Sequence, residues 1–306
     1  PGQEMAHTVL AKASDSAITA DSLAVKAASN SQAVNVAGSV AYGKTAGVGA
    51  ALAYNGLDNH IGAYLAGGSV TAKTPSTGVS VDVEGKNTGK IYGIGAAVAA
   101  SQNAAVNGTV VVNHGGSDTE AAVDEVRAEN GSNTAKDTVI TAAKAVTVKA
   151  ESNDVRVAAA GNVSASGKVA LGGAVAYNDV GGASSGTENA KQKTRAALVS
   201  TTLTNVKNGT VTVKAADNST LTTVGVGVGG AGKVAVQGAA ATSLVNKAVS
   251  AEVKDSSIDK DEDKAAVVSV QATSNSEINS TAVVGAGSGT FAGGAGVAVN
   301  RINQDT

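Results

Sequence analysis

The sequence has no cysteine and no tryptophan, and its 306 residues include only one phenylalanine, one methionine and five tyrosines. A globular interior of this size is normally filled with leucine, phenylalanine, methionine and tryptophan, whereas here most apolar residues are alanine and valine. Small side chains pack densely only where backbones come close together. The composition therefore predicts a thin structure, whose buried space is a narrow tube or a seam between sheets.

Other absences bear on partners and location. A total of 23 Lys and Arg residues against 25 Asp and Glu residues gives a net charge of -2 without a long basic tract, which argues against nucleic acid as a partner. No run of about 18 apolar residues is present, so the sequence predicts no membrane-spanning helix. The absence of cysteine is compatible with export through an oxidising compartment. Because the sequence starts at Pro1 without a leader, we expect a segment of a longer exported protein.

The strongest positive signal is a unit that recurs about five times. It opens with a strand-like run that ends in asparagine, as in Val-Thr-Val-Lys-Ala-Glu-Ser-Asn at residues 146–153. These asparagines recur at a nearly regular spacing of about 60 positions. Asparagine favours turns, so we expect equivalent turn positions on one side of the molecule for Asn30, Asn87, Asn153, Asn218 and Asn275. The chain is interpreted as one segment, 1–306, with units at approximately residues 22–78, 79–144, 145–208, 209–265 and 266–306.

A second line follows in each unit, built on Gly-Lys and an alternation of small residues, as at residues 167–178. In four units a stretch of similar length separates the opening asparagine from the Lys or Thr of this line, as from Asn153 to Lys168. In the second unit Lys90 instead follows Asn87 almost directly. We interpret the second unit as a copy that has lost most of one strand.

Within these lines the apolar residues alternate with period two, which indicates strands with one face inward. We therefore predict an all-β fold, a right-handed parallel β-helix (β-solenoid) of about five units of 57–66 residues. At about 20 residues per coil, each unit would supply about three coils, and about 15 coils would form a rod of about 70 Å. The alternative is a string of antiparallel β-sandwiches. Inward, stacked positions are expected for Val146, Val148, Val211, Val213, Val268 and Val270.

One stretch departs from the strand pattern. At residues 117–127, Ser117 and Glu120 resemble a helix capping box. A short helix or an irregular loop is expected there.

The repeated lines resemble those of a known family. Gly-Lys-Val-Ala-Leu-Gly-Gly-Ala-Val-Ala-Tyr-Asn at residues 167–178, Phe-Ala-Gly-Gly-Ala-Gly-Val-Ala-Val-Asn-Arg-Ile at residues 291–302 and the preceding Val-x-Val strands are similar to the repeats of leukotoxin-type filamentous adhesins. The similarity covers residues from about 20 to 302. It implies a β-solenoid shaft on the surface of a diderm bacterium, secretion through an outer-membrane barrel and a role in attachment. It assigns no role to any particular residue.

Residues that could carry chemistry are few. Without cysteine, a serine nucleophile would depend on His7, His60 or His114, and all three lie in polar stretches where exposed loops are expected. No carboxylate recurs at coil spacing. The acidic run at residues 255–263 is interpreted as a solvated loop rather than a calcium site. The sequence therefore predicts no catalytic residue, no cofactor and no metal site.

Three functions stay open. The first is a structural shaft that mediates attachment as part of an exported surface filament, with a featureless surface. The second is a repeat surface that itself binds a host glycan, a matrix protein or a neighbouring filament. Tyrosine is enriched in binding surfaces, and the candidate binding patch consists of Tyr42, Tyr54 and Tyr64. The third, a carbohydrate-active β-helix enzyme, would need a cleft with grouped carboxylates.

Overall fold

The computed structural model describes residues 2–123, 125–127, 133–135, 137–181, 191–206, 209–260 and 266–306. Nearly all of these residues lie in strands, and no helix is present among them. The two large sheets contain parallel pairs, and the prediction of an all-β, parallel-stranded fold is confirmed.

Five strands form one sheet, called sheet B, in the order β17-β14-β10-β4-β2. Each has 22 to 24 residues, about four times the usual strand length. Each strand pairs with the corresponding strand of the next unit, so Val146, Val211 and Val268 are direct neighbours. The strands are β2 (Ser22–Gly43), β4 (Val79–Ser101), β10 (Ala143–Ser166), β14 (Thr210–Ala231) and β17 (Val267–Ser288).

The second sheet, sheet A, has eleven strands. In the middle units the part of the chain that lies in sheet A is divided into shorter strands. Strands β5, β6 and β9 pair in order with the long β3, and β11 and β12 pair in order with the long β15. Beside sheet A, β7 (Glu125–Arg127) and β8 (Asn133–Ala135) form a small antiparallel pair. The strands of sheet A are β1 (Gly2–Ala20), β3 (Ala46–Ala72), β5 (Ala104–His114), β6 (Ser117–Val123), β9 (Thr138–Thr141), β11 (Val169–Val180), β12 (Gln192–Val199), β13 (Thr201–Val206), β15 (Val234–Lys254), β16 (Ser257–Lys260) and β18 (Phe291–Asp305).

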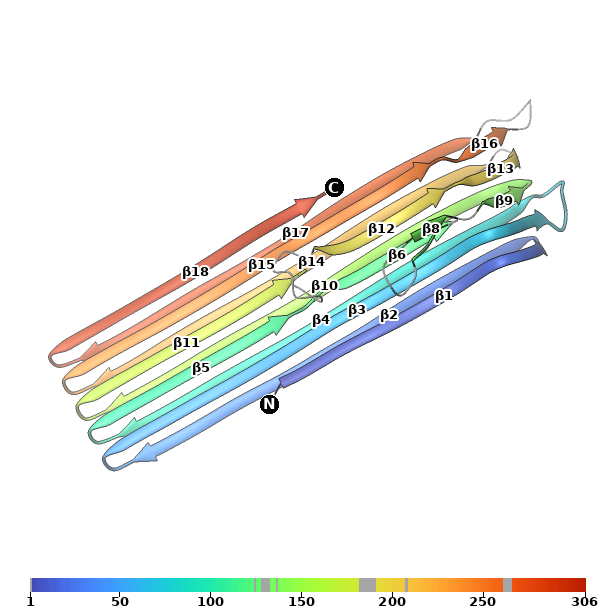
Figure 1. Ribbon diagram of the computed structural model, residues 1–306. Coiled ribbons are helices and arrows are strands. Elements are labelled where there is room, and N and C mark those ends of the chain that lie inside the picture. The colour runs from blue at the N-terminus through green and yellow to red at the C-terminus, as the bar shows by residue number, and fades with distance from the viewer. Residues whose placement is uncertain are drawn as a thin grey trace.

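Tight turns join each strand of sheet B to a strand of sheet A, and Figure 1 shows these turns gathered at one end of the molecule. The connection from β3 to β4 and the short strands β9, β13 and β16 lie at the other end. After each passage through sheet A the chain returns to sheet B beside the strand that it left. One unit therefore visits each sheet once, and the prediction of about three coils per unit is wrong.

The dimensions change with this correction. Five strands spaced about 4.8 Å apart extend only about 19 Å along the stack, whereas 22 residues at about 3.3 Å extend about 73 Å along a strand. The expected rod of about 70 Å along the stack is therefore wrong, because the long dimension is that of the strands. The error came from assuming about 20 residues per coil.

The second unit also differs from its prediction. Strand β4 is full-length, and Ser101 pairs with Gly43 of β2 and Ser166 of β10 at the turn end. Gly89 and Lys90 lie inside β4 and do not begin the second line. The second line of this unit begins at Ala104, after a turn that lacks the Gly-Lys pair. No strand has been lost.

At residues 117–127 the expected helix or loop is wrong where the chain is described. Residues 117–123 form β6, which pairs in parallel with β3 and with β12. Pairing on both sides outweighs the local capping signal of Ser117 and Glu120, because neighbouring strands satisfy the backbone hydrogen bonds that a helix would make internally.

The interior differs between the two ends of the strands. Toward the loops, buried valine, leucine and isoleucine side chains from both sheets form a single cluster that includes Val83, Val148, Val213, Ile61 and Leu198. Toward the turns, the main buried cluster consists of Ala53, Val111, Ala158, Ala160, Ala174 and Ala176. We call these two parts of the molecule the loop half and the turn half.

Sheet separation explains the small interior of the turn half. A Cβ atom added to Gly225 would lie 2.8 Å from the carbonyl oxygen of Ala240, and one added to Gly227 would lie 2.8 Å from that of Gly238. The backbone of β14 thus approaches β15 closely. Glycine is used here because a side chain would push the two sheets apart.

The predicted inward valines occupy the expected face and stack in register. Val146, Val148, Val211 and Val213 are at most 1% exposed. Val268 and Val270 are each 47% exposed because β17 is the edge strand of sheet B. Alternation therefore predicted the face correctly, and position in the stack sets the burial.

Candidate functional site

A layer of polar side chains crosses the interior between the loop half and the turn half. Its members lie at matching register positions on successive strands, so the layer runs through the whole stack. We call it the polar layer. Sheet B contributes Ser29, Ser31, Asn87, Ser152, Asp154, Asp217, Ser219, Ser274 and Ser276, and sheet A contributes Asn59, Ser117, Gln192, Lys247 and Gln304.

Hydrogen bonds connect the two sheets through this layer. The Asn59 amide donates to the Asn87 side-chain oxygen at 3.1 Å, and the Asn87 amide donates to the Ser152 hydroxyl at 3.2 Å. The Gln192 amide lies 2.7 Å from a carboxylate oxygen of Asp154 and 3.0 Å from one of Asp217. Gln192 therefore joins two buried acids of sheet B to sheet A.

Two charges in the polar layer form a buried ion pair. The side chains of Lys247 and Asp217 are both 0% exposed, and the Lys247 ammonium bonds the carboxylate directly. Thr194 also donates to Asp217, at 2.9 Å. Because each partner neutralises the other, the pair is tolerated inside the protein, whereas either charge alone would be costly.

Two further buried ionisable side chains, Asp154 and Arg156, lie near this pair. Arg156 is 1% exposed and donates to the backbone carbonyl of Asp179. Burial raises the pKa of the Asp154 carboxyl. Both groups are buried inside the stack.

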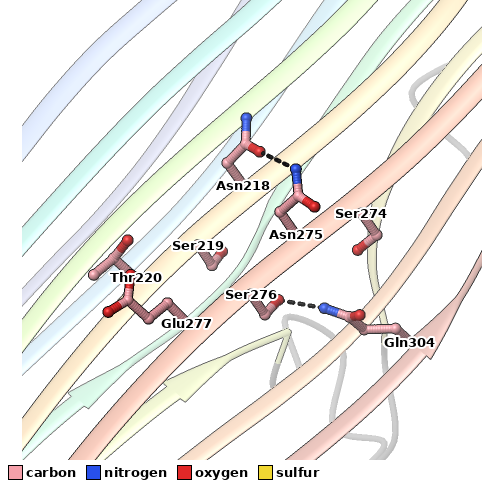
Figure 2. Close-up of a pocket in the computed structure, with 8 residues that line it drawn as sticks. All are labelled: Asn218, Ser219, Thr220, Ser274, Asn275, Ser276, Glu277 and Gln304. Atoms are coloured by element: carbon pink, nitrogen blue, oxygen red, sulfur yellow. Dashed lines mark hydrogen bonds between the residues drawn. The ribbon is translucent and has the colours of Figure 1, made fainter.

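The polar layer reaches the surface at the β17 edge. A shallow pocket of about 530 Å³ opens there and is lined by hydroxyl and amide side chains and one carboxylate, Glu277. Figure 2 shows Ser276 facing Gln304, which bonds it, with Asn275 bonded to Asn218 nearby. The lining offers hydrogen bonds but no grouped acids. It comprises Asn218, Ser219, Thr220, Ser274, Asn275, Ser276, Glu277 and Gln304.

The asparagines expected in turns lie within strands, so the turn assignment is wrong for Asn30, Asn87, Asn153, Asn218 and Asn275. Four of them share one register position on the outer face of sheet B, where the fifth strand has Thr88. Asn87 is one position away and points inward. The amides form an outer ladder, with Asn218 donating to Asn153 at 3.0 Å and Asn275 to Asn218 at 3.1 Å.

A second, buried asparagine ladder was not predicted. Asn55 donates to Asn113 at 2.8 Å, and Asn113 donates to Asn178 at 2.8 Å. Asn178 continues the network by donating to the Thr223 hydroxyl at 2.7 Å. The signal was present in the sequence, because the second lines at residues 44–55 and 167–178 both end in asparagine.

The predicted tyrosine patch does not form. Tyr64 is 2% exposed, and its hydroxyl donates to Glu120 at 2.8 Å. Tyr42 lies on β2 of sheet B and is 77% exposed, whereas Tyr54 lies on β3 of sheet A. The grouping is wrong because sequence proximity does not place these side chains on one surface.

The histidines lie in strands rather than in the expected loops: His7 in β1, His60 in β3 and His114 at the end of β5. His114 lies 2.9 Å from a carboxylate oxygen of Asp179. This hydrogen bond raises the pKa of the His114 imidazole. No serine accompanies this pair in the hydrogen bonds of the described residues.

Other features concern metals and membranes. Across the described residues, no group of three or more His, Cys, Asp or Glu side chains is placed to hold a metal ion. The same part of the chain contains no helix long and apolar enough to cross a membrane. The acidic run at 255–263 lies partly outside the described residues.

No protein-family model, curated protein or solved structure matches the chain. The similarity to leukotoxin-type filamentous adhesins therefore stays a prediction from the sequence lines quoted above.

Proposed function

We propose that the chain is a non-enzymatic structural segment of an exported bacterial surface filament of the adhesin kind, wound as a right-handed parallel β-solenoid. Its place would be the cell surface of a diderm bacterium, and its secretion partner an outer-membrane barrel. The proposal gives the segment a mechanical role in attachment, as the shaft. It requires no cofactor.

One observation carries the proposal: residue-by-residue stacking of successive units. Between β10 and β14, 22 consecutive residues pair without a shift, and the pairing continues from β14 to β17. Such a stack satisfies backbone hydrogen bonds at each added unit, and each unit contacts mainly its neighbours. Parallel crossover connections are almost always right-handed, which supports the proposed winding.

The geometry also shapes the kind of shaft proposed. Each unit adds only about 4.8 Å along the stack and presents faces about 73 Å wide. A shaft of this type has wide lateral faces, and each added unit increases its length only slightly. This favours, as a second candidate function, contact between the repeat surface and a neighbouring filament, over binding of a host glycan or matrix protein.

Removing one whole unit tests the structural part of the proposal. Deletion of residues 211–267 removes β14, β15 and β16 and joins Thr210 to Val268. Val268 already lies in register with Val211, so β17 can take the place of β14 on β10. The deletion also removes Asp217 and Lys247 together. We expect retained β-sheet circular dichroism and cooperative melting.

A deletion of residues 211–233 is the matched control. It removes β14 and its turn but keeps β15, so sheet B loses a strand that sheet A retains, and Lys247 loses Asp217. This variant should lose cooperative melting. Loss of β signal in the whole-unit deletion as well would contradict the stacked-unit proposal.

Immunogold labelling of intact producing cells tests the location, with an antibody raised against residues 1–306. Label on the outer surface is expected. Label only inside permeabilised cells would contradict a surface filament. Purified chain should also release no product from polysaccharides, and turnover would overturn the non-enzymatic assignment.

A further inference from the structure

The outer face of sheet B in the turn half is an uncharged apolar surface. Outward side chains there come from all five strands, and several are strongly exposed: Val36 at 67%, Val40 at 85% and Tyr42 at 77%. Further exposed members are Val98, Val163, Val228 and Val283. None of the outward positions in register with residues 34–42 is charged. We call this surface the apolar face.

The loop half of the same sheet has a different exterior. There Lys26 pairs with Asp82 at 2.5 Å and with Glu84 at 3.1 Å, and Lys149 pairs with Glu151 at 2.6 Å. The strands and the neighbours are the same in both halves. The apolar face is thus not a general property of the exterior of sheet B.

The apolar face is large. Five strands about 4.8 Å apart and nine residues of about 3.3 Å each give about 710 Å². The largest apolar patch on an ordinary monomer covers about 300–600 Å². Two such faces packed together would bury about 1,400 Å², which lies within the range of about 1,200–2,000 Å² for stable interfaces.

Side-chain sizes across the face identify a second copy as the fitting occupant. The register row that begins with Tyr42 continues as Ala100, Ala165, Gly230 and Gly287, from large to small. The row that begins with Gly38 continues as Ala96, Gly161, Val226 and Val283, with small residues on the first three strands and valine on the last two. A twofold axis that runs parallel to the strands above β10 would place each register row of one copy opposite the same row of the second copy, with the order of the strands reversed. Tyr42 would then meet Gly287 of the second copy, and Gly38 would meet Val283.

The glycines of these rows have no explanation within the chain itself. A Cβ atom added to Gly230 or to Gly287 would meet no atom within 4 Å. Glycine weakens a strand, and within a strand it often marks close approach of another chain. Under the twofold arrangement Gly287 lies opposite Tyr42 and Gly38 lies opposite Val283, so each of these two glycines leaves room for a large side chain of the second copy.

We propose that two copies of this chain pack face to face through the apolar face of sheet B, with parallel strands and with unit order reversed. Residues of the central strand β10 then lie opposite themselves. The proposal does not depend on the chain's being part of a surface filament.

The absence of cysteine permits a direct cross-linking test. Ala165 is exposed on β10 beside the proposed axis, so an Ala165→Cys variant should form a covalent dimer under mild oxidation. Gly173 on β11 is the matched control, because it lies on the outer face of sheet A with open space around its Cα. Gly173→Cys should stay monomeric on a non-reducing gel. The reverse result would overturn the proposal.

Sedimentation of the full chain gives an independent readout. The unmodified chain should be dimeric, and Val163→Lys should weaken dimerisation at least about a hundredfold, because two like charges would meet at the axis. Val175→Lys is its control on sheet A, since Val175 is 43% exposed and Val163 47%. Circular dichroism checks that both variants fold.

Three results would contradict the second copy as occupant. One is dimerisation that survives Val163→Lys, which would indicate contact through the strand edges. Another is equal loss in both lysine variants. The third is a monomeric chain that floats with phosphatidylcholine vesicles and loses flotation on Val163→Lys, which would assign the apolar face to lipid.

Discussion

The loop half and the turn half use the same strands in opposite ways. In the loop half, valine, leucine and isoleucine fill the interior, and charged pairs such as Lys26 with Asp82 cover the outside. In the turn half, alanine and glycine fill the interior and valine covers the outside. Parallel pairing continues through both halves. Continuous strands therefore do not require one burial pattern, because the same backbone pairing runs through both halves whatever the side chains are.

The largest effect should come from placing a charge in the loop-half interior. Val213→Asp buries an unpaired carboxylate at a position that is 0% exposed, and it should cost at least about 4 kcal/mol. Val236→Asp on β15 places the charge on the outer face of sheet A in the turn half, away from the apolar face, and should cost less than about 1 kcal/mol. Denaturant midpoints compare the two. Similar midpoints would contradict the inward and outward assignments.

Breaking the ion pair at the boundary should come next. Lys247→Met leaves the buried Asp217 carboxylate without its cation and should cost about 3–5 kcal/mol. Adding Asp217→Asn removes the unpaired carboxylate and should restore at least half of the lost stability. An equally unstable double variant would indicate that packing around Lys247, and not charge pairing, stabilises the polar layer.

The two asparagine ladders allow the stability contributed by buried amide hydrogen bonds to be compared with that of exposed ones. Asn113→Ala leaves the amide of Asn55 and the oxygen of Asn178 without their partner inside the protein, and it should cost about 2 kcal/mol. Asn218→Ala removes the equivalent contact from the half-exposed outer ladder and should cost less than about 0.5 kcal/mol. Thermal melting measures both, and a larger loss for Asn218→Ala would reverse the comparison.

The smallest effect concerns His114 at the end of β5. Its hydrogen bond with Asp179 raises the pKa of the imidazole above its ordinary 6.5. The resulting stability is fully present below pH 6.5, and it is lost as pH rises through the higher folded-state value. His114→Gln should therefore be less stable than the unmodified chain at about pH 5.5 by less than about 1 kcal/mol, with the difference shrinking by about pH 8.5. A difference that grows with pH would contradict the pairing.

The sequence predicted what depends on alternation, and it failed where distant strands decide the outcome. Val146 and Val213 face inward because period two fixes the face of a strand. Asn153 was expected in a turn from its own preference, but the Asn218 amide on the adjacent strand bonds it within the sheet. A short helix or an irregular loop was expected from Ser117 onward, but pairing on both sides holds this segment as a strand.

Of the candidate site, the sequence could show the recurring asparagines but not the polar layer. Asp217, Gln192 and Lys247 are far apart along the chain, and no local pattern connects them. They meet because the two sheets face each other and the register of each strand is set by its neighbours. A prediction of the polar layer would have required the coil length, which alternation does not specify.

Coil length is also the central claim, and one distance tests it. Spin labels attached through Asn30→Cys and Asn275→Cys lie on β2 and β17, the two edge strands of sheet B, at one register position. With one coil per unit they are four strand spacings apart, about 19 Å; with three coils per unit they would be twelve spacings apart, about 58 Å. Pulsed electron paramagnetic resonance, with the labelled chain diluted into unlabelled chain, reads this separation. We expect the shorter of these two distances, and a measured separation close to the longer one would contradict one coil per unit.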